Sequence, residues 1–148
     1  MPATLIPADD VQRLFKDLYG LPVTAAVCED PSLEIFGALA NYVDSTDAVK
    51  GRILCDMSAA AILGAALVQI PVGAVEDAVA EKELSETLRE NVSEVFNIIV
   101  NIFPAHLTER LVLKDVQTDA AEIDTAGASV FTLTFPRYGE GKLFVFAD

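Results

Sequence analysis

The chain has 148 residues and a formal net charge of −13, from 10 Lys and Arg against 23 Asp and Glu. Hydrophobic residues make up 52 % and charged residues 22 %, which is typical of a globular domain and not of a disordered chain. Because so acidic a chain repels nucleic-acid phosphates and anionic membrane surfaces, we expect neither as a partner. We expect residues 1–148 to form a single domain.

The N-terminal sequence MPATLIPADD lacks the basic region and the long apolar core of a secretory signal. An uncharged stretch runs from Met57 to Val75, but it is rich in Ala and Gly and is interrupted by Pro71. It therefore predicts a buried helix and no membrane insertion. Cys28 and Cys55 have no C-x-x-C spacing and indicate reduced, buried thiols. Together these features predict a cytoplasmic protein.

The first half of the chain predicts a helix, three strands and a second helix. The first helix spans residues 9–20, with Asp9 as its cap and Gly20 at its end. Runs of apolar and β-branched residues then predict three strands, at residues 23–28, 33–43 and 50–55. An Ala-rich run predicts the second helix at residues 58–69.

In the second half, an acidic stretch at residues 76–86 leads into a long helix that Pro104 ends or kinks. Further apolar runs predict three strands, at residues 111–118, 129–136 and 142–146. A Gly-containing loop at residues 137–141 joins the last two into a hairpin. Helices and strands thus follow in blocks. This order predicts an α+β fold, in which two long helices pack on an antiparallel or mixed sheet of about six strands, with an additional N-terminal helix.

The long helix carries the sequence ENVSEVFNIIVNIF at residues 90–103. At about 100° per residue, Glu90, Asn97 and Asn101 lie within about 60° of Glu94 on the helical wheel. The apolar residues form a separate stripe that faces a core: Leu88, Val92, Val95, Phe96, Ile99, Ile102 and Phe103. Ile98 flanks the polar line as a partly exposed apolar residue.

A solvated surface is the simplest explanation of the polar line, because Glu is a good helix former. Asn is not, since each Asn in a helix interior costs a few tenths of a kcal/mol relative to Ala. Its side-chain amide both donates and accepts hydrogen bonds, so it can orient a water molecule or bind a polar group of a partner. We therefore interpret the outer face of this helix as a docking strip made of Glu90, Glu94, Asn97, Ile98 and Asn101.

The chain lacks the residues that other kinds of catalysis require. His106 is the only histidine, so neither a metal hydrolase nor a Ser-His-Asp triad has a complete set of groups, and we expect no metal site. The chain has no phosphate-binding G-x-x-x-x-G-K-[ST] loop. We interpret one run of acidic residues as a solvated loop: Asp115, Asp119, Glu122 and Asp124.

Over most of its length the chain resembles the CheC/CheX family of chemotaxis phosphatases, from LYGLPV near the N-terminus to VFTLTFPRYGEGKLFVF at the C-terminal end. The signature of that family is a Glu-x-x-Asn pair on a long helix, which corresponds here to Glu94-Val-Phe-Asn97. The predicted helix at residues 58–69 carries no such pair, so the resemblance is to the single-site CheX type. It implies one CheX-like domain over residues 1–148 and a homodimer.

The resemblance implies that the protein dephosphorylates the phosphoaspartate of a CheY-like response regulator. Asn97 would orient the attacking water, and Glu94 would contact the regulator's lysine. The three other residues of the docking strip would bind the partner: Glu90, Ile98 and Asn101. The protein would need no cofactor of its own, because the phosphorylated partner supplies Mg²⁺.

The chain departs from the family pattern at two places. Family members often carry Asp or Ser where this chain has Glu90, and a Pro about 21 residues after the Asn, whereas residues 116–120 contain none. The alternative is therefore a non-catalytic CheX-like module. It would dock a response regulator, or another signalling or flagellar partner, through the same helix.

Overall fold

The structure, a computed structural model, describes residues 6–103, 111–119 and 123–147. The helices among them are α1 (Ala8–Tyr19), α2 (Met57–Leu67), α3 (Val72–Glu81), α4 (Glu86–Ile98) and the short 3₁₀ helix η1 (Ile99–Ile102). The strands are β1 (Thr24–Val27), β2 (Phe36–Val43), β3 (Val49–Asp56), β4 (Val112–Gln117), β5 (Ser129–Phe135) and β6 (Gly139–Ala147). They form one sheet in the order β1-β5-β6-β3-β2-β4, in which each neighbouring pair is antiparallel. The predicted α+β class is confirmed.

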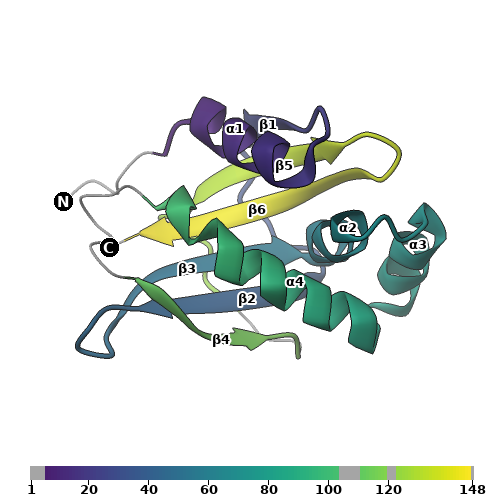
Figure 1. The fold of residues 1–148 in the computed structure, drawn as a ribbon. Helices are drawn as coiled ribbons and strands as arrows, with labels where there is room; N and C mark the ends of the chain where they lie inside the picture. The colour runs from purple at the N-terminus through teal and green to yellow at the C-terminus, as the bar shows by residue number, and fades with distance from the viewer. Residues whose placement is uncertain (1–5, 104–110, 120–122, 148) are drawn as a thin grey trace.

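α1, α2 and α4 lie on one face of the sheet, and α3 packs beside α2 (Figure 1). α2 occupies the centre, where it packs on β2, β3 and β6. α4 runs obliquely across the sheet, packs against α2 and reaches β4, while α1 lies over β1 near the opposite edge. The predicted arrangement of two helices on the sheet with an additional N-terminal helix is therefore confirmed.

The main core fills the space between these helices and the sheet. Side chains alternate along a strand, so that every second residue of β2 faces the helices, as Ala38, Ala40 and Tyr42 do. α2 is buried continuously over residues 59–66, because the sheet, α3 and α4 all pack on it. Small residues permit this close packing: a Cβ atom added at Gly141 of β6 would collide with the backbone of Ala59 in α2.

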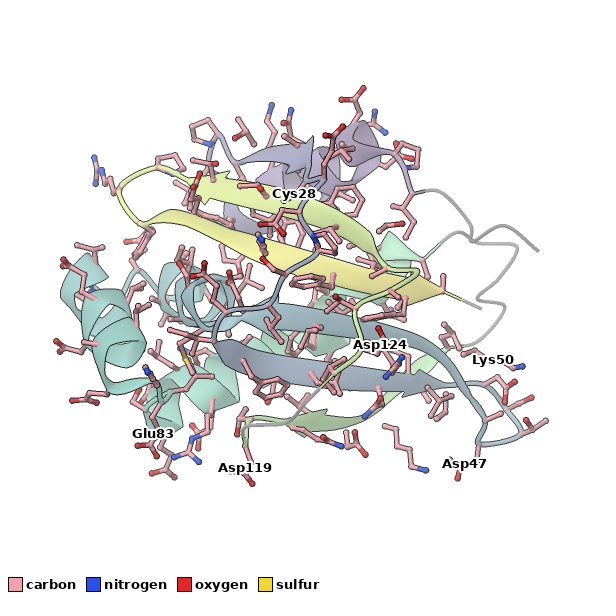
Figure 2. The ribbon with its side chains drawn as sticks, turned by 180° about the vertical axis from the view of Figure 1, so that it is seen from behind. Cys28, Asp47, Lys50, Glu83, Asp119 and Asp124 are labelled. Atoms are coloured by element: carbon pink, nitrogen blue, oxygen red, sulfur yellow. The ribbon has the colours of Figure 1, made fainter. Side chains whose placement is uncertain are left out.

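The opposite face of the sheet is shown in Figure 2, where two extended segments cross it, one running on from Cys28 and one passing Asp124. Beneath them lies a smaller apolar cluster made of Phe36, Leu39, Leu54, Val130 and Phe144. Lys142 holds the first segment, because its Nζ donates a hydrogen bond of 3.1 Å to the carbonyl of Asp30. The helix-bearing face is therefore the more deeply packed of the two.

α1 begins differently from the prediction. Its N-cap is Pro7 and not Asp9, and no side chain caps it. Pro7 holds the extended backbone that precedes a helix, which leaves Asp9 and Asp10 in the first turn, where their charges favour the helix dipole. The end at Gly20 is confirmed: its φ is +65°, and its amide donates a hydrogen bond of 2.8 Å to the carbonyl of Lys16.

The prediction missed α3 as a separate helix. The acidic stretch at residues 76–86 does not run directly into the long helix, because most of it belongs to α3. Pro71 stands at the N-cap of α3 and separates it from α2, which ends at Leu67. α3 forms because Val75 and Ala78, three residues apart, give it one buried side against α2.

Two predictions about single residues were also wrong. Cys28 is half-buried, since it follows the edge strand β1, whereas Cys55 in the central strand β3 is buried as predicted. Asp115 belongs to β4 and not to a loop, because it pairs with Asn41 of β2, whose Nδ2 donates a hydrogen bond of 2.7 Å to its carboxylate. Three residues that the sequence analysis considered lie outside the described residues: Pro104, His106 and Glu122.

Candidate functional site

The docking strip lies on the outer face of α4 and continues onto η1. All five of its side chains are exposed: Glu90, Glu94, Asn97, Ile98 and Asn101. The residues between them form a buried stripe: Leu88, Val92, Val95, Phe96, Ile99, Ile102 and Phe103. The predicted division of this segment into an apolar inner face and a polar outer face is therefore confirmed. One detail was wrong, because the α-helix ends at Ile98 and Asn101 lies in η1.

The N-terminal half of α4 is fixed to α2 by close backbone contact. The Ser85 hydroxyl caps α4 and accepts a hydrogen bond of 3.2 Å from the amide of Leu88. A Cβ atom added at Gly64 of α2 would lie only 2.8 Å from the carbonyl oxygen of Leu88. Asn91 uses the same close approach, since its Nδ2 donates a hydrogen bond of 3.0 Å to the carbonyl of Gly64. The sequence pattern did not indicate Asn91 as a contact between the helices.

The C-terminal end of α4 is fixed by Tyr42 of β2. The Tyr42 hydroxyl donates a buried hydrogen bond of 2.6 Å to the carbonyl of Phe96, the residue that precedes Asn97. Burial raises the pKa of Tyr42 well above its ordinary value, so the hydroxyl keeps the proton that it donates. The ring of Phe103 packs edge-on against Tyr42, with 5.1 Å between the centroids, and covers Gly51. No pattern in the sequence indicated this contact.

The polar groups of the strip are available to a partner. Among the described residues, neither Glu94 nor Asn97 forms a side-chain hydrogen bond or an ion pair within the chain. They lie three residues apart on one helix face, so both can contact the same surface of a docked molecule. A carboxylate and an amide at this spacing can bind a cation and orient a water molecule side by side.

α2 has no comparable surface. It is buried continuously over residues 59–66 and has no exposed Glu-x-x-Asn pair.

Within the ranges that the structure describes, no group of three His, Cys, Asp or Glu side chains is arranged to hold a metal ion. In the same ranges, none of the helices is long and apolar enough to cross a membrane. The outer face of α4 is therefore the strongest candidate site.

No protein-family model matches the chain, and a search of curated proteins finds no match. Solved structures do match it. FliM from H. pylori, in the crystal structure of a FliM–SpeE complex, superposes with a TM-score of 0.61 at 9 % identity, covering 95 % of this chain and 80 % of that one. The chemotaxis protein CheX from Vibrio vulnificus superposes with a TM-score of 0.56 at 11 % identity, covering 95 % and 92 %.

A third match is a chain from the crystal structure of the CheX–CheY–BeF3–Mg²⁺ complex of Borrelia burgdorferi. Its TM-score is 0.50 at 13 % identity, and the match covers 96 % of this chain and 98 % of that one. At such identities the likeness is one of fold, and it confirms the resemblance found in the sequence. The chain therefore has the fold of CheX and CheC-like chemotaxis proteins, which is also the fold of FliM.

Proposed function

We propose that the protein is a chemotaxis-type phosphatase that hydrolyses the phosphoaspartate of a CheY-like response regulator. The observation that carries the proposal is the exposed pair Glu94 and Asn97 on the outer face of α4, in a chain with the CheX fold. The structure from Borrelia burgdorferi, a complex of CheX with CheY, supports a CheY-like receiver as the partner.

The proposed reaction requires few groups from the phosphatase itself. Hydrolysis breaks the bond between phosphorus and the aspartate oxygen and forms a bond from phosphorus to the oxygen of water. Such a transfer depends mainly on positioning and on neutralising charge. Asn97 orients the attacking water in line with the breaking bond, and Glu94 binds the receiver's lysine. The receiver supplies the Mg²⁺, so the phosphatase needs no cofactor of its own.

The other residues of the docking strip bind the receiver. Glu90 lies one turn before Glu94 and adds a second carboxylate, while Asn101 lies one turn after Asn97 and adds a second amide. Ile98 is 40 % exposed and gives the strip an apolar contact.

The proposal also includes a homodimer, which light scattering tests directly. A homodimer predicts a molar mass equal to two chains, and a mass of one chain contradicts it.

A second candidate is a binding module without catalysis, which docks a receiver or a flagellar partner through the same strip. The observation behind it is that FliM shares this fold, with a TM-score of 0.61, as CheX from Vibrio vulnificus does with a TM-score of 0.56. A shared fold does not decide function. The departures from the family pattern, Glu90 and the absence of Pro at residues 116–120, are compatible with this candidate.

The decay of a phosphorylated CheY-like receiver separates the two candidates. We expect the wild-type protein to accelerate the decay, and Asn97→Ala to lose on the order of 10²-fold of this acceleration because the water is no longer oriented. Glu76→Ala, at an exposed position on α3, is the control and leaves the acceleration unchanged.

Binding to the same receiver, activated with beryllofluoride, is measured in parallel for wild type and Asn97→Ala. Retained binding together with lost acceleration supports the role of Asn97. If the wild-type protein binds receivers without accelerating the decay of any of them, the second candidate replaces the first. If it neither binds nor accelerates, the phosphatase candidate is wrong, and so is the form of the second candidate in which the partner is a receiver.

A further inference from the structure

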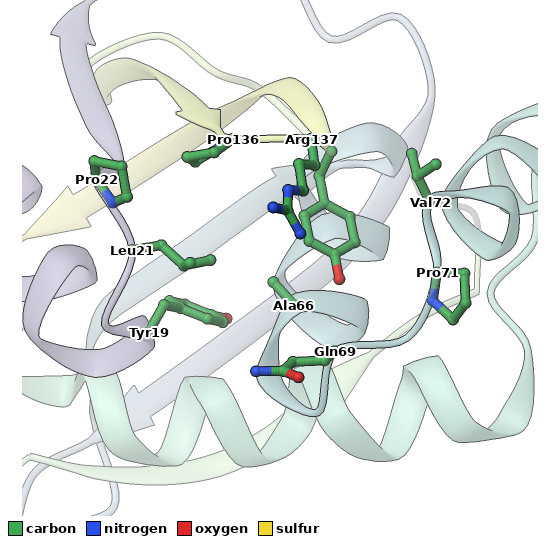
Figure 3. A pocket seen from close by; sticks show the side chains of 10 residues that line it. Tyr19, Leu21, Pro22, Ala66, Gln69, Pro71, Val72, Pro136 and Arg137 are labelled. Carbon is green, nitrogen blue, oxygen red and sulfur yellow. The ribbon is translucent and has the colours of Figure 1, made fainter.

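A cavity of about 610 Å³ is lined by residues that are separate from the docking strip (Figure 3). It lies where the C-terminal ends of α1 and α2 meet the start of α3 and the turn between β5 and β6. Its volume falls in the range of pockets that bind small molecules, roughly 300–1,000 Å³. Neither the fold nor the proposed function accounts for it.

Most of the residues that line the cavity are apolar or aromatic in type. They include Leu21, Pro71, Val72 and Pro136. Two tyrosines complete the walls, and both of their hydroxyls are already bonded: Tyr19 donates to the carbonyl of Leu63 at 2.7 Å, and Tyr138 donates to the carbonyl of Ile70 at 2.7 Å. These rings therefore offer the cavity their carbon surfaces, and other groups must supply its polar contacts.

Two side chains supply those polar contacts, Arg137 and Gln69. Figure 3 shows the Arg137 guanidinium directed into the middle of the cavity, with the Gln69 amide at its lower rim. Among the described residues, no ion pair involves Arg137, and the cavity lining contains no Asp or Glu. In a chain of net charge −13, this pocket thus presents a guanidinium without a carboxylate beside it.

The backbone of both residues is unusual. Arg137 has a φ of +72° and Gln69 a φ of +58°, a region that glycine adopts easily and that costs other residues about 1–2 kcal/mol. At Gln69 this conformation ends α2, where the amide of Ile70 donates a hydrogen bond of 2.9 Å to the carbonyl of Ala65, and at Arg137 it forms the turn after Pro136. At the turn between β5 and β6, a glycine would relieve the strain but would remove the guanidinium from the cavity.

From this geometry we infer that the cavity binds a small organic anion, with an apolar or aromatic body and a single carboxylate. The body packs against the proline and tyrosine side chains. The carboxylate accepts hydrogen bonds from the Arg137 guanidinium, which can bind it in a bidentate way, and from the Gln69 amide. This site is independent of the proposed phosphatase function, because it shares no residue with the docking strip.

Three matched probes test the inference: 4-phenylbutyrate, its neutral amide and the corresponding amine. Each is titrated into the ¹⁵N-labelled full chain, and amide shifts give the site and the Kd. We expect 4-phenylbutyrate to shift the cavity residues in a saturable way and to bind at least tenfold more tightly than the amide, with the amine weakest. Equal affinity for the acid and the amide, shifts that do not saturate, or shifts outside the cavity would overturn the inference.

Variants of the arginine locate the anion site. Arg137→Gln should remove the preference for the acid over the amide, and Arg137→Lys should keep part of it. Arg13→Gln is the matched control, since Arg13 is an exposed arginine on α1 outside the cavity lining, and it should bind like wild type. If Arg137→Gln keeps its fold, as judged by its amide spectrum, and binds the acid unchanged, the inference fails.

Other occupants of the cavity give different results. If the cavity residues shift only when a CheY-like receiver is added, or only as the concentration of the protein itself is raised, the cavity is a protein contact and the small-anion assignment is wrong.

Discussion

α2 and α4 pack against each other, yet they present opposite kinds of surface. α2 consists mostly of small apolar residues and is buried continuously over residues 59–66, since the sheet, α3 and α4 pack on it. α4 packs its apolar stripe against α2 and exposes its polar face, on which Glu94 and Asn97 lie. The buried helix α2 therefore supports the fold, and the half-exposed helix α4 presents the candidate site to solvent. Changes to each should therefore have separate consequences.

The largest effect is expected on the inner stripe of α4. Phe96 is fully buried, so Phe96→Ala should lower the free energy of unfolding by about 3–5 kcal/mol. Its neighbour on the chain, Asn97, is exposed, and Asn97→Ala should change that free energy by less than about 0.5 kcal/mol. Urea unfolding measures both. Similar losses for the two variants would show that α4 does not divide into a supporting face and a displayed face.

The contact between the helices is tested at Gly64. Gly64→Ala places a Cβ atom against the Leu88 carbonyl and should cost about 1–3 kcal/mol of stability. The control is Gly73→Ala in α3, where the added Cβ meets open space and should stabilise the helix by about 0.5–1 kcal/mol. Thermal unfolding of the two variants gives the comparison. If Gly64→Ala is as stable as Gly73→Ala, the close approach of α2 and α4 is absent.

The anchor at the end of α4 is tested by Tyr42→Phe. This change removes the hydrogen bond to the carbonyl of Phe96 and leaves that buried carbonyl without the hydroxyl, at a cost of about 1–3 kcal/mol. Hydrogen exchange should show faster opening of the amides around Asn97 than of those near Ser85. Uniformly faster exchange along α4 would contradict a local anchor.

The smallest effect is expected at the start of α2 and depends on pH. Asp56 caps α2 by accepting a hydrogen bond of 2.8 Å from the amide of Ala59, and burial raises the pKa of its carboxyl. A raised folded-state pKa means that ionisation destabilises the fold above that pKa, and that this destabilisation vanishes below the unfolded-state value of about 3.9. Asp56→Asn keeps the cap without the charge.

We therefore expect Asp56→Asn to be more stable than wild type at pH 7, with the difference shrinking as the pH is lowered past the folded-state pKa of Asp56. Urea unfolding at several pH values measures this difference. An advantage of Asp56→Asn that grows toward acid pH would contradict the assignment.

The sequence predicts most of the fold because its patterns are local. The existence of the six strands, Gly20 after α1 and the two faces of α4 all follow from periodicity and turn residues. Some strand ends were wrong: β2 begins at Phe36 and not at residue 33, and β6 begins at Gly139, inside the predicted loop at residues 137–141, because β6 continues to pair with β5 there. α3 was missed because its composition is acidic and its buried side consists of only Val75 and Ala78. That residues 1–148 form a single domain remains a prediction.

The anchors of the candidate site could not be predicted for a different reason. Tyr42 and Phe96 are 54 residues apart in sequence, and Asn91 and Gly64 are 27 apart, so only the folded chain brings each pair together. One signal was present for Asn91, which lies at the border of the apolar stripe on the helical wheel, where a side-chain amide can reach a neighbouring backbone. The cavity around Arg137 gave no signal in the sequence, because four separate elements build it.

The proposed phosphatase function requires that a receiver docks on the outer face of α4, so the most direct measurement is the footprint of that receiver. An unlabelled CheY-like receiver, activated with beryllofluoride and Mg²⁺, is added to the ¹⁵N-labelled protein, and amide shifts are mapped along the chain. If the receiver docks on the outer face of α4, we expect the largest shifts on residues 90–101. Binding with shifts confined to the opposite face of the sheet, around Asp30 and Lys142, would contradict it.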